Sequence, residues 1–529
     1  MDMIVNATGS SLCTTFLIIG TVALKGALGF SPRSKFFFGP FSSPPTIRTF
    51  HLTMVGPAPS SSTLLAASTG KESVAIIGGG IAGLSCAQRL SLSGNFDCTV
   101  FDTGRLRPGG RCSSRLVGDK PKAESEGLQV PEVYPILSKH IIDHAAQILT
   151  VPAGPEYTEF RKQVKQWEVQ GIVRRYPTKT VCDILTNNKQ GQGGVFYLKP
   201  LNTENGDDKP LMYYGTKGMA SIPLAMAQSS GGMFQIHQDV WVSPSNGVRY
   251  QRGTSRNWKL QANGQTLGLF DRIVIAHNGK CADRLMSKTP AKDLHSLLQV
   301  NFSPSVPKWG GKRMTLNSIY SLTIAIDATT CPLSQVLDKN RFICGFVKNE
   351  PSLRFLSCHS RKYNSTDPEH PNVEVWTILS SPTFAKQYKA PQEFLPPETV
   401  SNVTALLLQA VERSLGLPTD SLSNEILERR LQLWGAAVPL NVWTSRDDRK
   451  NHDDESSGFV YDGEYRVGVC GDWLLEPSIA GAWESGRRLA EFMEQSKLSK
   501  SEQSVGLPTL GGKFLVSNEA SRAGIGALR

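Results

Sequence analysis

Short apolar runs and an amphipathic segment alternate at the start of the folded part of the chain. Residues 73–77, Ser-Val-Ala-Ile-Ile, predict a buried strand, and Ile81–Leu92 has the apolar spacing of a helix. A second apolar run, Cys98–Phe101, predicts another short buried strand. A strand, a helix and a strand in this order are typical of a parallel sheet in an α/β fold.

The turn between the first strand and the helix carries three glycines at the spacing of a dinucleotide-binding loop. Gly78 would allow the tight turn, Gly80 would let the backbone approach a pyrophosphate, and Gly83 would permit close packing of the helix on the strand. Ile81 and Ala82 open the helix, whose N-terminus offers free N–H groups and a partial positive charge to phosphates. We therefore expect these five residues to bind a dinucleotide.

Polar residues after the second strand extend this site. Asp102 follows the glycines by about twenty residues, where a carboxylate can accept both ribose hydroxyls and would repel the 2′-phosphate of NADP. Next comes a segment with Arg105 and Gly109-Gly110-Arg111, in which the glycines expose N–H groups and an arginine can pair with phosphate. A nicotinamide dehydrogenase does not need this second phosphate contact.

A second glycine–acid element stands near the end of the chain. Gly471 and Asp472 precede a helix in which Pro477 suits the first turn, and Ile479 and Ala480 follow. An isoalloxazine ring at this helix end would place N1 and O2, which gain negative charge on reduction, in the field of the helix dipole. Asp472 would hold a ribityl hydroxyl. The two elements together predict FAD as the cofactor.

These motifs resemble those of the flavin-containing amine oxidase superfamily, and within it the chain is most similar to renalase and the renalase-like FAD/NAD(P)-binding oxidoreductases. The resemblance extends over about residues 72–496. Further similar stretches are Ile142–Gln147, Tyr214–Met219, Pro351–Leu356, Val375–Trp376 and Leu433–Pro439. Two departures stand out: Ala145 occupies a usual glycine position, and residues 116–139 form an insertion.

The resemblance implies an α/β fold in which a Rossmann-type FAD-binding domain is interrupted by a substrate domain with a mainly antiparallel sheet. The expected FAD-binding parts are 71–139, with the polar insertion 116–139, then 210–300 and 456–496; the expected substrate-domain parts are 140–209 and 301–455. Residues 446–457 form a second polar stretch, and 497–529 are expected to be a flexible tail. Val240, on an alternating strand-like segment, is expected beside the adenine.

The resemblance also implies oxidation of a small amine or a reduced nicotinamide by hydride transfer to flavin N5, with O2 or another acceptor taking the electrons. His144, Gln147 and Trp434 are the candidates for the substrate face of the flavin, although each could instead be an ordinary core residue. No general base is required. The alternatives are a desaturase- or isomerase-type flavoenzyme acting on a hydrophobic metabolite, and a flavin-binding protein without turnover.

Composition and charge narrow the choice of partners. The chain has 529 residues and a net charge of +11, much of it in the two terminal segments, so nucleic acid is not an expected partner. Its ten cysteines include no C-x-x-C pair and no cluster at zinc spacing, so neither a metal site nor a disulfide framework is expected. The sequence does not specify an oligomeric state.

Residues 1–70 are interpreted as a targeting presequence that is removed. The apolar core Phe16–Leu24 is shorter than the roughly 20 residues of a membrane-spanning helix, so no stable membrane insertion is expected after processing. Residues 31–69 contain no Asp or Glu and are rich in Ser, Thr and Pro. This order resembles the bipartite plastid presequence of algae with secondary plastids; the secretory pathway is the alternative destination.

Overall fold

The computed structural model describes residues 70–119, 134–187, 195–202, 211–228, 233–253, 257–338, 341–392, 394–445, 456–500 and 502–517. Residues 1–69 of the predicted presequence therefore lie outside the described residues, as do most of the two polar insertions and residues 518–529. Within the described ranges, no helix is both long enough and apolar enough to span a bilayer.

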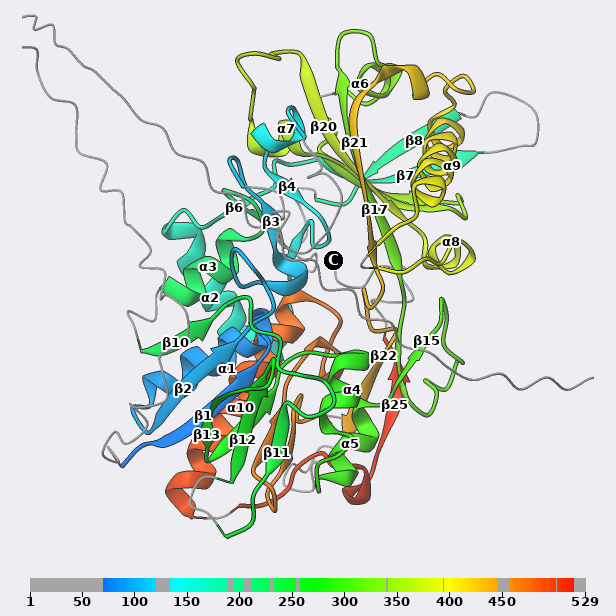
Figure 1. Ribbon diagram of the computed structural model, residues 1–529. Helices are drawn as coiled ribbons and strands as arrows, with labels where there is room; N and C mark the ends of the chain where they lie inside the picture. Colours follow the sequence, from blue (N-terminus) through cyan, green and yellow to red (C-terminus); the bar gives the residue numbers. More distant parts are fainter. Residues whose placement is uncertain are drawn as a thin grey trace, which may run out of the picture. The chain divides into compact units, whose positions relative to one another are not determined.

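A six-stranded sheet forms the dinucleotide-binding part of the fold (Figure 1). Its strands, in spatial order, are β10 (Phe234–His237), β2 (Phe96–Phe101), β1 (Glu72–Ile77), β14 (Arg272–Ile275), β24 (Val467–Val469) and β23 (Val460–Asp462). All neighbouring pairs are parallel except β23 with β24. The parallel sheet confirms the α/β class, because its short apolar strands are covered on both faces.

Alternate residues of β1 contribute to two separate hydrophobic cores. Val74 and Ile76 belong to a cluster that includes side chains of α1 (Ile81–Leu92) and α10 (Ile479–Ser499). Ala75 and Ile77 belong to a second cluster with Trp258, which lies in a three-stranded sheet of β11 (Val248–Tyr250), β12 (Trp258–Ala262) and β13 (Gln265–Phe270). Helices therefore cover one face of the large sheet and a small antiparallel sheet the other.

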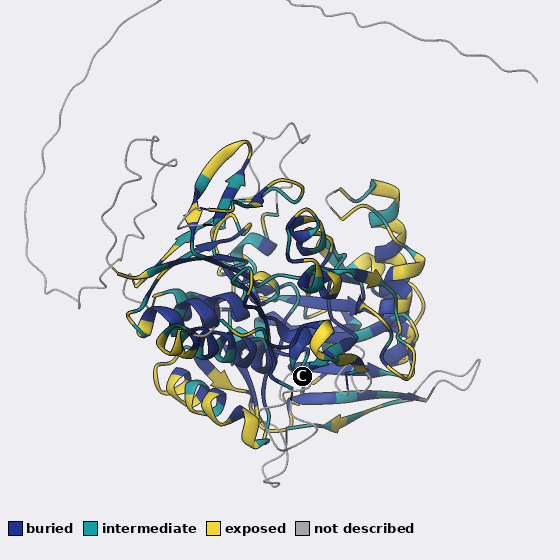
Figure 2. Cartoon of the chain, turned by 90° about the horizontal axis from the view of Figure 1, so that it is seen from below, coloured by how far each residue is buried: buried dark blue, intermediate teal, exposed yellow. Residues whose placement is uncertain are grey.

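The second large sheet has seven strands and is antiparallel except between β18 and β7, as expected for a mainly antiparallel substrate domain. Its order is β21 (Ile426–Trp434), β17 (Ile319–Asp327), β20 (Val373–Ser380), β19 (Leu353–Cys358), β18 (Cys344–Lys348), β7 (Val181–Asn187) and β8 (Val195–Pro200). The associated helices are α6 (Pro332–Val336), α7 (His359–Tyr363), α8 (Pro382–Gln387) and α9 (Pro397–Leu415). The central strands are dark blue in Figure 2, and exposed residues gather on outer turns and helices.

Smaller elements connect the two sheets. Strands β5 (Leu149–Val151), β9 (Leu211–Gly215) and β6 (Val173–Arg175) form a three-stranded sheet, and β3 (Ser114–Arg115) pairs with β4 (Ile142–Asp143). Strand β15 (Val300–Phe302) pairs in parallel with β16 (Met314–Leu316). The remaining helices are α2 (Thr158–Val169), α3 (Ser221–Gln228), α4 (Lys280–Met286) and α5 (Lys292–Leu298).

The prediction of a flexible tail from residue 497 is wrong for the part of that segment the structure describes. Helix α10 continues to Ser499, and β25 (Gly512–Val516) pairs antiparallel with β22 (Asn441–Ser445). Phe514 is buried, and its ring lies 5.1 Å from that of Trp443. Both rings join the cluster that contains Ile77, so β22 also packs with the dinucleotide-binding part rather than with the antiparallel sheet.

Helices α1 and α10 approach each other closely because small residues meet at their contact. A Cβ atom on Gly486 would lie 2.1 Å from the carbonyl oxygen of Ala82. The hydroxyl of Ser85 donates to the carbonyl of Trp483 at 2.8 Å. This contact fixes the start of the first helix against the last helix of the same domain.

We predict that Gly486→Ala lowers the free energy of unfolding by about 1–3 kcal/mol, because the added methyl group overpacks the contact. The loss is expected even though alanine is the better helix former by about 1 kcal/mol. Chemical denaturation measures the change, with Gln495→Ala on the exposed side of α10 as a control that should stay near wild type. A stabilised Gly486→Ala variant would contradict the described contact.

Candidate dinucleotide site

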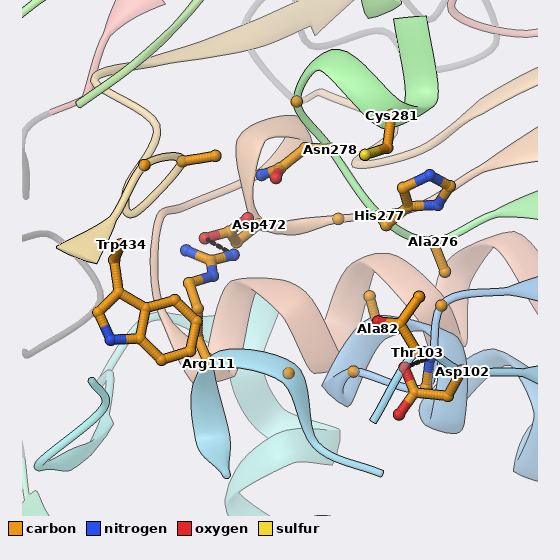
Figure 3. A pocket seen from close by; sticks show the side chains of 18 of the residues that line it. Ala82, Asp102, Thr103, Arg111, Ala276, His277, Asn278, Cys281, Trp434 and Asp472 are labelled. Carbon is orange, nitrogen blue, oxygen red and sulfur yellow. Dashed lines mark hydrogen bonds and ion pairs between the residues drawn. The ribbon is translucent and has the colours of Figure 1, made fainter. Parts of the chain in front are cut away.

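A cavity of about 840 Å³ opens at the carboxyl ends of the parallel strands. The residues at the ends of β1, β2, β14 and β24 that line it are Ile77, Phe101, Ala276 and Cys470. Its described lining includes residues 77–82, 101–103, 109–112, 240–242, 276–281, 389–392, 433–436 and 470–473. Ligands of open parallel sheets bind in this position. Figure 3 shows residues from both ends of the chain around the cavity.

The glycine turn has the geometry that its spacing predicts. Gly78 has φ +117°, and a Cβ there would lie 3.0 Å from the carbonyl carbon of Ala276. At Gly80 a Cβ would meet nothing within 4 Å, so the backbone borders open space in the cavity. Gly83 does not line the cavity; a Cβ there would lie 2.0 Å from the carbonyl oxygen of Gly78. Gly83 therefore serves the packing of α1, while Gly80, Ile81 and Ala82 border the cavity.

Asp102 lines the cavity, and one of its two carboxylate oxygens is buried without a regular hydrogen bond. Its Oδ1 accepts a hydrogen bond from the amide of Gly79 at 3.1 Å, whereas its buried Oδ2 makes no hydrogen bond of regular geometry. Burial raises the pKa of Asp102, against the opposing effect of the amides of Gly79, Gly104 and Thr103. A buried acceptor without a partner is costly, so ligand hydroxyl groups would stabilise this carboxylate.

An ion pair joins the arginine motif to the C-terminal motif. Arg111 Nη2 lies 2.8 Å from Asp472 Oδ2, and Arg111 Nη1 donates to the carbonyl of Ala437 at 3.0 Å (Figure 3). Gly110, with φ +54°, brings this segment against Gly80, since a Cβ on Gly110 would lie 3.7 Å from the Gly80 Cα. The ion pair is thus held next to the glycine turn, and both of its residues line the cavity.

The start of α10 also faces the cavity. Ser478 caps the helix by accepting from the amide of Gly481 at 2.9 Å, and Ser478, Ile479 and Ala482 line the cavity. Ala480 is fully buried and is not among the lining residues. The amide of Gly471 donates to Ser485 Oγ at 2.9 Å, which fixes the entry to the helix. The N-terminus of this long helix therefore directs its dipole toward the cavity.

Several lining residues carry no sequence signal that would have selected them. Trp241 follows the predicted Val240, lines the cavity and is 53% exposed. The backbone amide of Val240 donates to the carbonyl of Asp102 at 3.0 Å, which ties this segment to the end of β2. His277 and Asn278 follow β14, and His277 Nδ1 lies 3.0 Å from the Ile77 carbonyl oxygen. Burial lowers the pKa of His277.

The far end of the cavity is formed by the antiparallel sheet and one loop. Trp434, at the end of β21, lines the cavity with Leu433, and its indole nitrogen is buried without a hydrogen-bond partner. The exposed loop 389–392 also lines this end, and Gln392 Oε1 accepts from the amide of Gly435 at 2.9 Å. Of the three candidates for the substrate face, Trp434 is the one that the structure places on the cavity.

His144, Gln147 and Arg105 do not line the cavity, contrary to expectation. Gln147 is fully buried, and its Nε2 donates to the carbonyl of Asp143 at 2.7 Å. Burial lowers the pKa of His144 to about 3, with Arg430 adding to the shift, so its imidazole is neutral near pH 7. Ala146, between these two residues, borders the cavity instead. Arg105 is exposed.

A buried ion pair explains the position of Gln147. Lys362 Nζ lies 2.7 Å from Asp143 Oδ2 and donates to the carbonyl of Gln147 at 2.7 Å; both charged side chains are fully buried. Ser114 and Tyr363 donate hydrogen bonds to the same carboxylate. The ammonium group also lies 5.3–5.8 Å from three ring centres, those of Tyr176, Tyr214 and Tyr363. This network links α7 to β3 and β4, and Gln147 belongs to it.

Outside the cavity, one group of described side chains could hold a metal ion: ligand atoms of Asp367, Glu369 and His370 lie within 4.8 Å of one another. Lys139 Nζ lies 3.4 Å from Asp367 and also pairs with Glu369. The lysine already supplies a positive charge to these carboxylates, so a cation would have to displace it.

The comparisons with known proteins agree with the geometry of the dinucleotide end. Residues 76–163 match the family described as an NAD(P)-binding Rossmann-like domain. The match includes the glycine turn, Asp102 and Arg111, and it covers less than half of the chain. It confirms the expected dinucleotide-binding fold of this part.

Solved structures give more distant likenesses. A redesigned triple mutant of putrescine oxidase is 11% identical, with a TM-score of 0.46 over 80% of this chain and 99% of that chain. An oxidoreductase from Methanosarcina mazei is 12% identical, with a TM-score of 0.42 over 80% of this chain and 100% of that chain. At these scores neither likeness assigns an activity.

We predict that Lys362→Met lowers the free energy of unfolding at pH 7 by about 3–5 kcal/mol, because it leaves Asp143 buried without its cation. In the wild type, burial raises the pKa of Asp143 but Lys362 outweighs it, and the pKa falls from 3.8 to about 2. A depressed folded-state pKa contributes stability above about pH 4 that is lost as the pH falls toward 2.

In the variant, burial alone would raise the pKa of Asp143 above its ordinary value, so the deficit relative to wild type should shrink as the pH falls from 7 toward 5. Urea unfolding at several pH values measures this. Lys348→Met, which removes the partner of the less buried Asp183 at 3.3 Å, is the control and should cost less than about 1 kcal/mol. A pH-independent deficit would show that Asp143 is not held ionised by Lys362.

Proposed function

We propose that this chain is an FAD-dependent oxidoreductase of the flavin-containing amine oxidase superfamily, of the renalase-like type. The observation that carries the proposal is a single cavity that extends from Asp102, past the glycine turn and the Arg111–Asp472 pair, to Trp434. A mononucleotide would leave one end of this cavity unused. An extended dinucleotide with a large ring system matches both ends.

The lining residues fit FAD part by part. The carboxylate of Asp102 would accept hydrogen bonds from the adenosine ribose, and the exposed Trp241 offers a flat surface to the adenine. The open backbone at Gly80, together with the N-terminus of α1, suits the pyrophosphate. Arg111 would face the cofactor while Asp472 and the carbonyl of Ala437 hold its guanidinium. The N-terminus of α10 suits the pyrimidine edge of the isoalloxazine ring.

Bound FAD would accept a hydride at N5 and pass the electrons to O2 or another acceptor. The chain would supply orientation and exclusion of water, and Trp434 with Leu433 would form an apolar wall at the substrate end. A dihydronicotinamide gives up its hydride without losing a proton, so for that donor no side chain has to act as a general base. His144 and Gln147 would act at most through the position of Ala146, not by touching the donor.

The charges of the lining favour one of the two donor classes. Among the described lining residues, Asp102 and Asp472 are the carboxylates; the first lies at the dinucleotide end and the second is paired with Arg111. The substrate end instead carries the exposed Lys389. A cationic amine would find no negative charge there. The phosphates of a reduced nicotinamide nucleotide would find the positive charge of Lys389. We therefore propose a reduced nicotinamide as donor ahead of an amine.

A second candidate is a flavoenzyme acting on a hydrophobic metabolite, because Phe302, Leu433 and Trp434 make much of the substrate end apolar. Anaerobic mixing of the flavin-loaded protein with one donor at a time separates these functions by the loss of flavin absorbance. Bleaching by a dihydronicotinamide supports the proposal, bleaching by a primary amine alone reverses the order of donors, and bleaching by a polyene alone supports the second candidate. A flavin that no donor reduces would point to a binding protein without turnover.

We predict that Gly80→Val raises the Kd for FAD by about tenfold or more, equivalent to at least about 1.4 kcal/mol. The valine side chain would occupy the space through which the pyrophosphate approaches. Gly80 has φ −76° and ψ 179°, a conformation open to any residue, and its surroundings leave room for a side chain. The protein without flavin should therefore unfold at nearly the wild-type temperature.

Flavin content after purification and fluorescence titration of the apoprotein measure the effect. Gly80→Ala is the graded control, with an intermediate loss. Normal flavin affinity in a folded Gly80→Val variant would remove the glycine turn from the cofactor site.

A further inference from the structure

The loop between β15 and β16, residues 303–313, exposes a tryptophan among basic residues. Trp309 is 60% exposed, whereas Trp258 and Trp376, for example, are fully buried in the cores. Lys308, Lys312 and Arg313 are also exposed. Within the described ranges, no ion pair or hydrogen bond engages the side chain of any of these three cations. We call Lys308, Trp309, Lys312 and Arg313 the basic–aromatic loop.

The basic–aromatic loop is fixed by buried contacts. Asn441 is fully buried, and its Nδ2 donates to the carbonyls of Gly310 at 2.6 Å and Arg313 at 2.8 Å. Gly310 has φ +94°, and a Cβ there would lie 1.9 Å from the carbonyl oxygen of Phe514, so the loop backbone lies directly against β25. The backbone that carries the exposed tryptophan is therefore anchored, and less conformational entropy is lost when a partner binds.

The surroundings continue the same chemistry. Lys513 and Leu515 are exposed residues of β25, next to the loop (Figure 1 shows β15 beside β22 and β25). The sequence contains no acidic residue between Asp293 and Asp327, so the loop has no carboxylate in its own segment. Positive charge and exposed apolar surface therefore coincide in this segment of the chain.

We propose that the basic–aromatic loop, with Lys513 and Leu515, docks the protein on an anionic lipid membrane surface. Tryptophan partitions into the interfacial region of bilayers because its ring is apolar and its N–H is polar. Basic residues near the surface are attracted by anionic lipids, each contributing about fivefold in affinity. The contact is peripheral: one side chain enters the headgroup region and the cations remain among the phosphates.

A nucleic acid or an acidic protein would also attract the cations, but neither explains the fixed, exposed tryptophan as well. Proteins that bind single-stranded nucleic acid without sequence preference use several aromatic side chains along a groove, on which successive bases stack. This loop carries one aromatic residue, flanked closely on both sides by cations. A flat, anionic surface with an apolar interior satisfies both features at once.

The test is co-sedimentation of the full chain with vesicles of phosphatidylcholine alone and of phosphatidylcholine with phosphatidylglycerol. Wild type should bind the anionic vesicles and lose binding as salt is raised. The triple variant Lys308→Gln, Lys312→Gln, Arg313→Gln should bind roughly a hundredfold more weakly, at about fivefold per removed charge. A variant with the same net charge, Lys165→Gln, Lys217→Gln, Lys386→Gln, removes exposed lysines elsewhere and should bind nearly as wild type.

Trp309→Ala separates insertion from attraction. It should weaken binding to anionic vesicles while leaving the salt dependence in place, and Trp309→Phe should restore part of the loss. Each variant should keep the wild-type unfolding temperature, because the substituted side chains are exposed. Thermal unfolding checks this. Wild type that binds neither vesicle, equal weakening by both triple variants, or binding to RNA but not to anionic vesicles would overturn the proposal.

Discussion

Arg111 and Asp472 form an ion pair between a segment that follows the second strand and a segment that enters the last helix, and the geometry of the cavity depends on this contact. The guanidinium is held on one side by the carboxylate and on another by the Ala437 carbonyl. The loops that carry Gly110 and Gly80 lie in contact next to this pair, since a Cβ on Gly110 would lie 3.7 Å from the Gly80 Cα. Without the pair, the glycine turn and the start of α10 would lack their charged connection across the site.

The two ends of the cavity are built from different kinds of structural element. The dinucleotide end is built from the ends of parallel strands, whose positions are fixed by main-chain hydrogen bonds and by two buried cores. The substrate end of the cavity is lined by the end of β21 and by an exposed loop, in which Gln392 accepts a hydrogen bond from the Gly435 amide. The dinucleotide end therefore lies on rigid elements, and under the proposed function the donor would meet the end of β21 and this loop.

Local patterns predicted the dinucleotide end well, because the glycine turn, Asp102 and Arg111 act within segments whose structure is set by near neighbours. Long-range contacts determined what the patterns missed. Gln147 belongs to the Asp143–Lys362 network, and Lys362 is far away in the sequence. Phe514 belongs to a core that Trp443 and Trp473 complete, and both tryptophans are distant in the sequence. The short segment Gly512–Val516 does not alternate between apolar and polar residues, so it gave no sign of a strand. Trp241 follows a strand with nothing to mark it as a lining residue.

The central claim is that one cavity holds an entire FAD, with adenosine and flavin at opposite ends. Titration of the apoprotein with FAD and with FMN, which lacks the adenosine half, tests it most directly. The account predicts a Kd for FAD that is at least about tenfold lower, a difference of about 1.4 kcal/mol, and predicts that Asp102→Ala removes much of this advantage without weakening FMN. Equal affinities for the two flavins, or no affinity for either, would contradict the account.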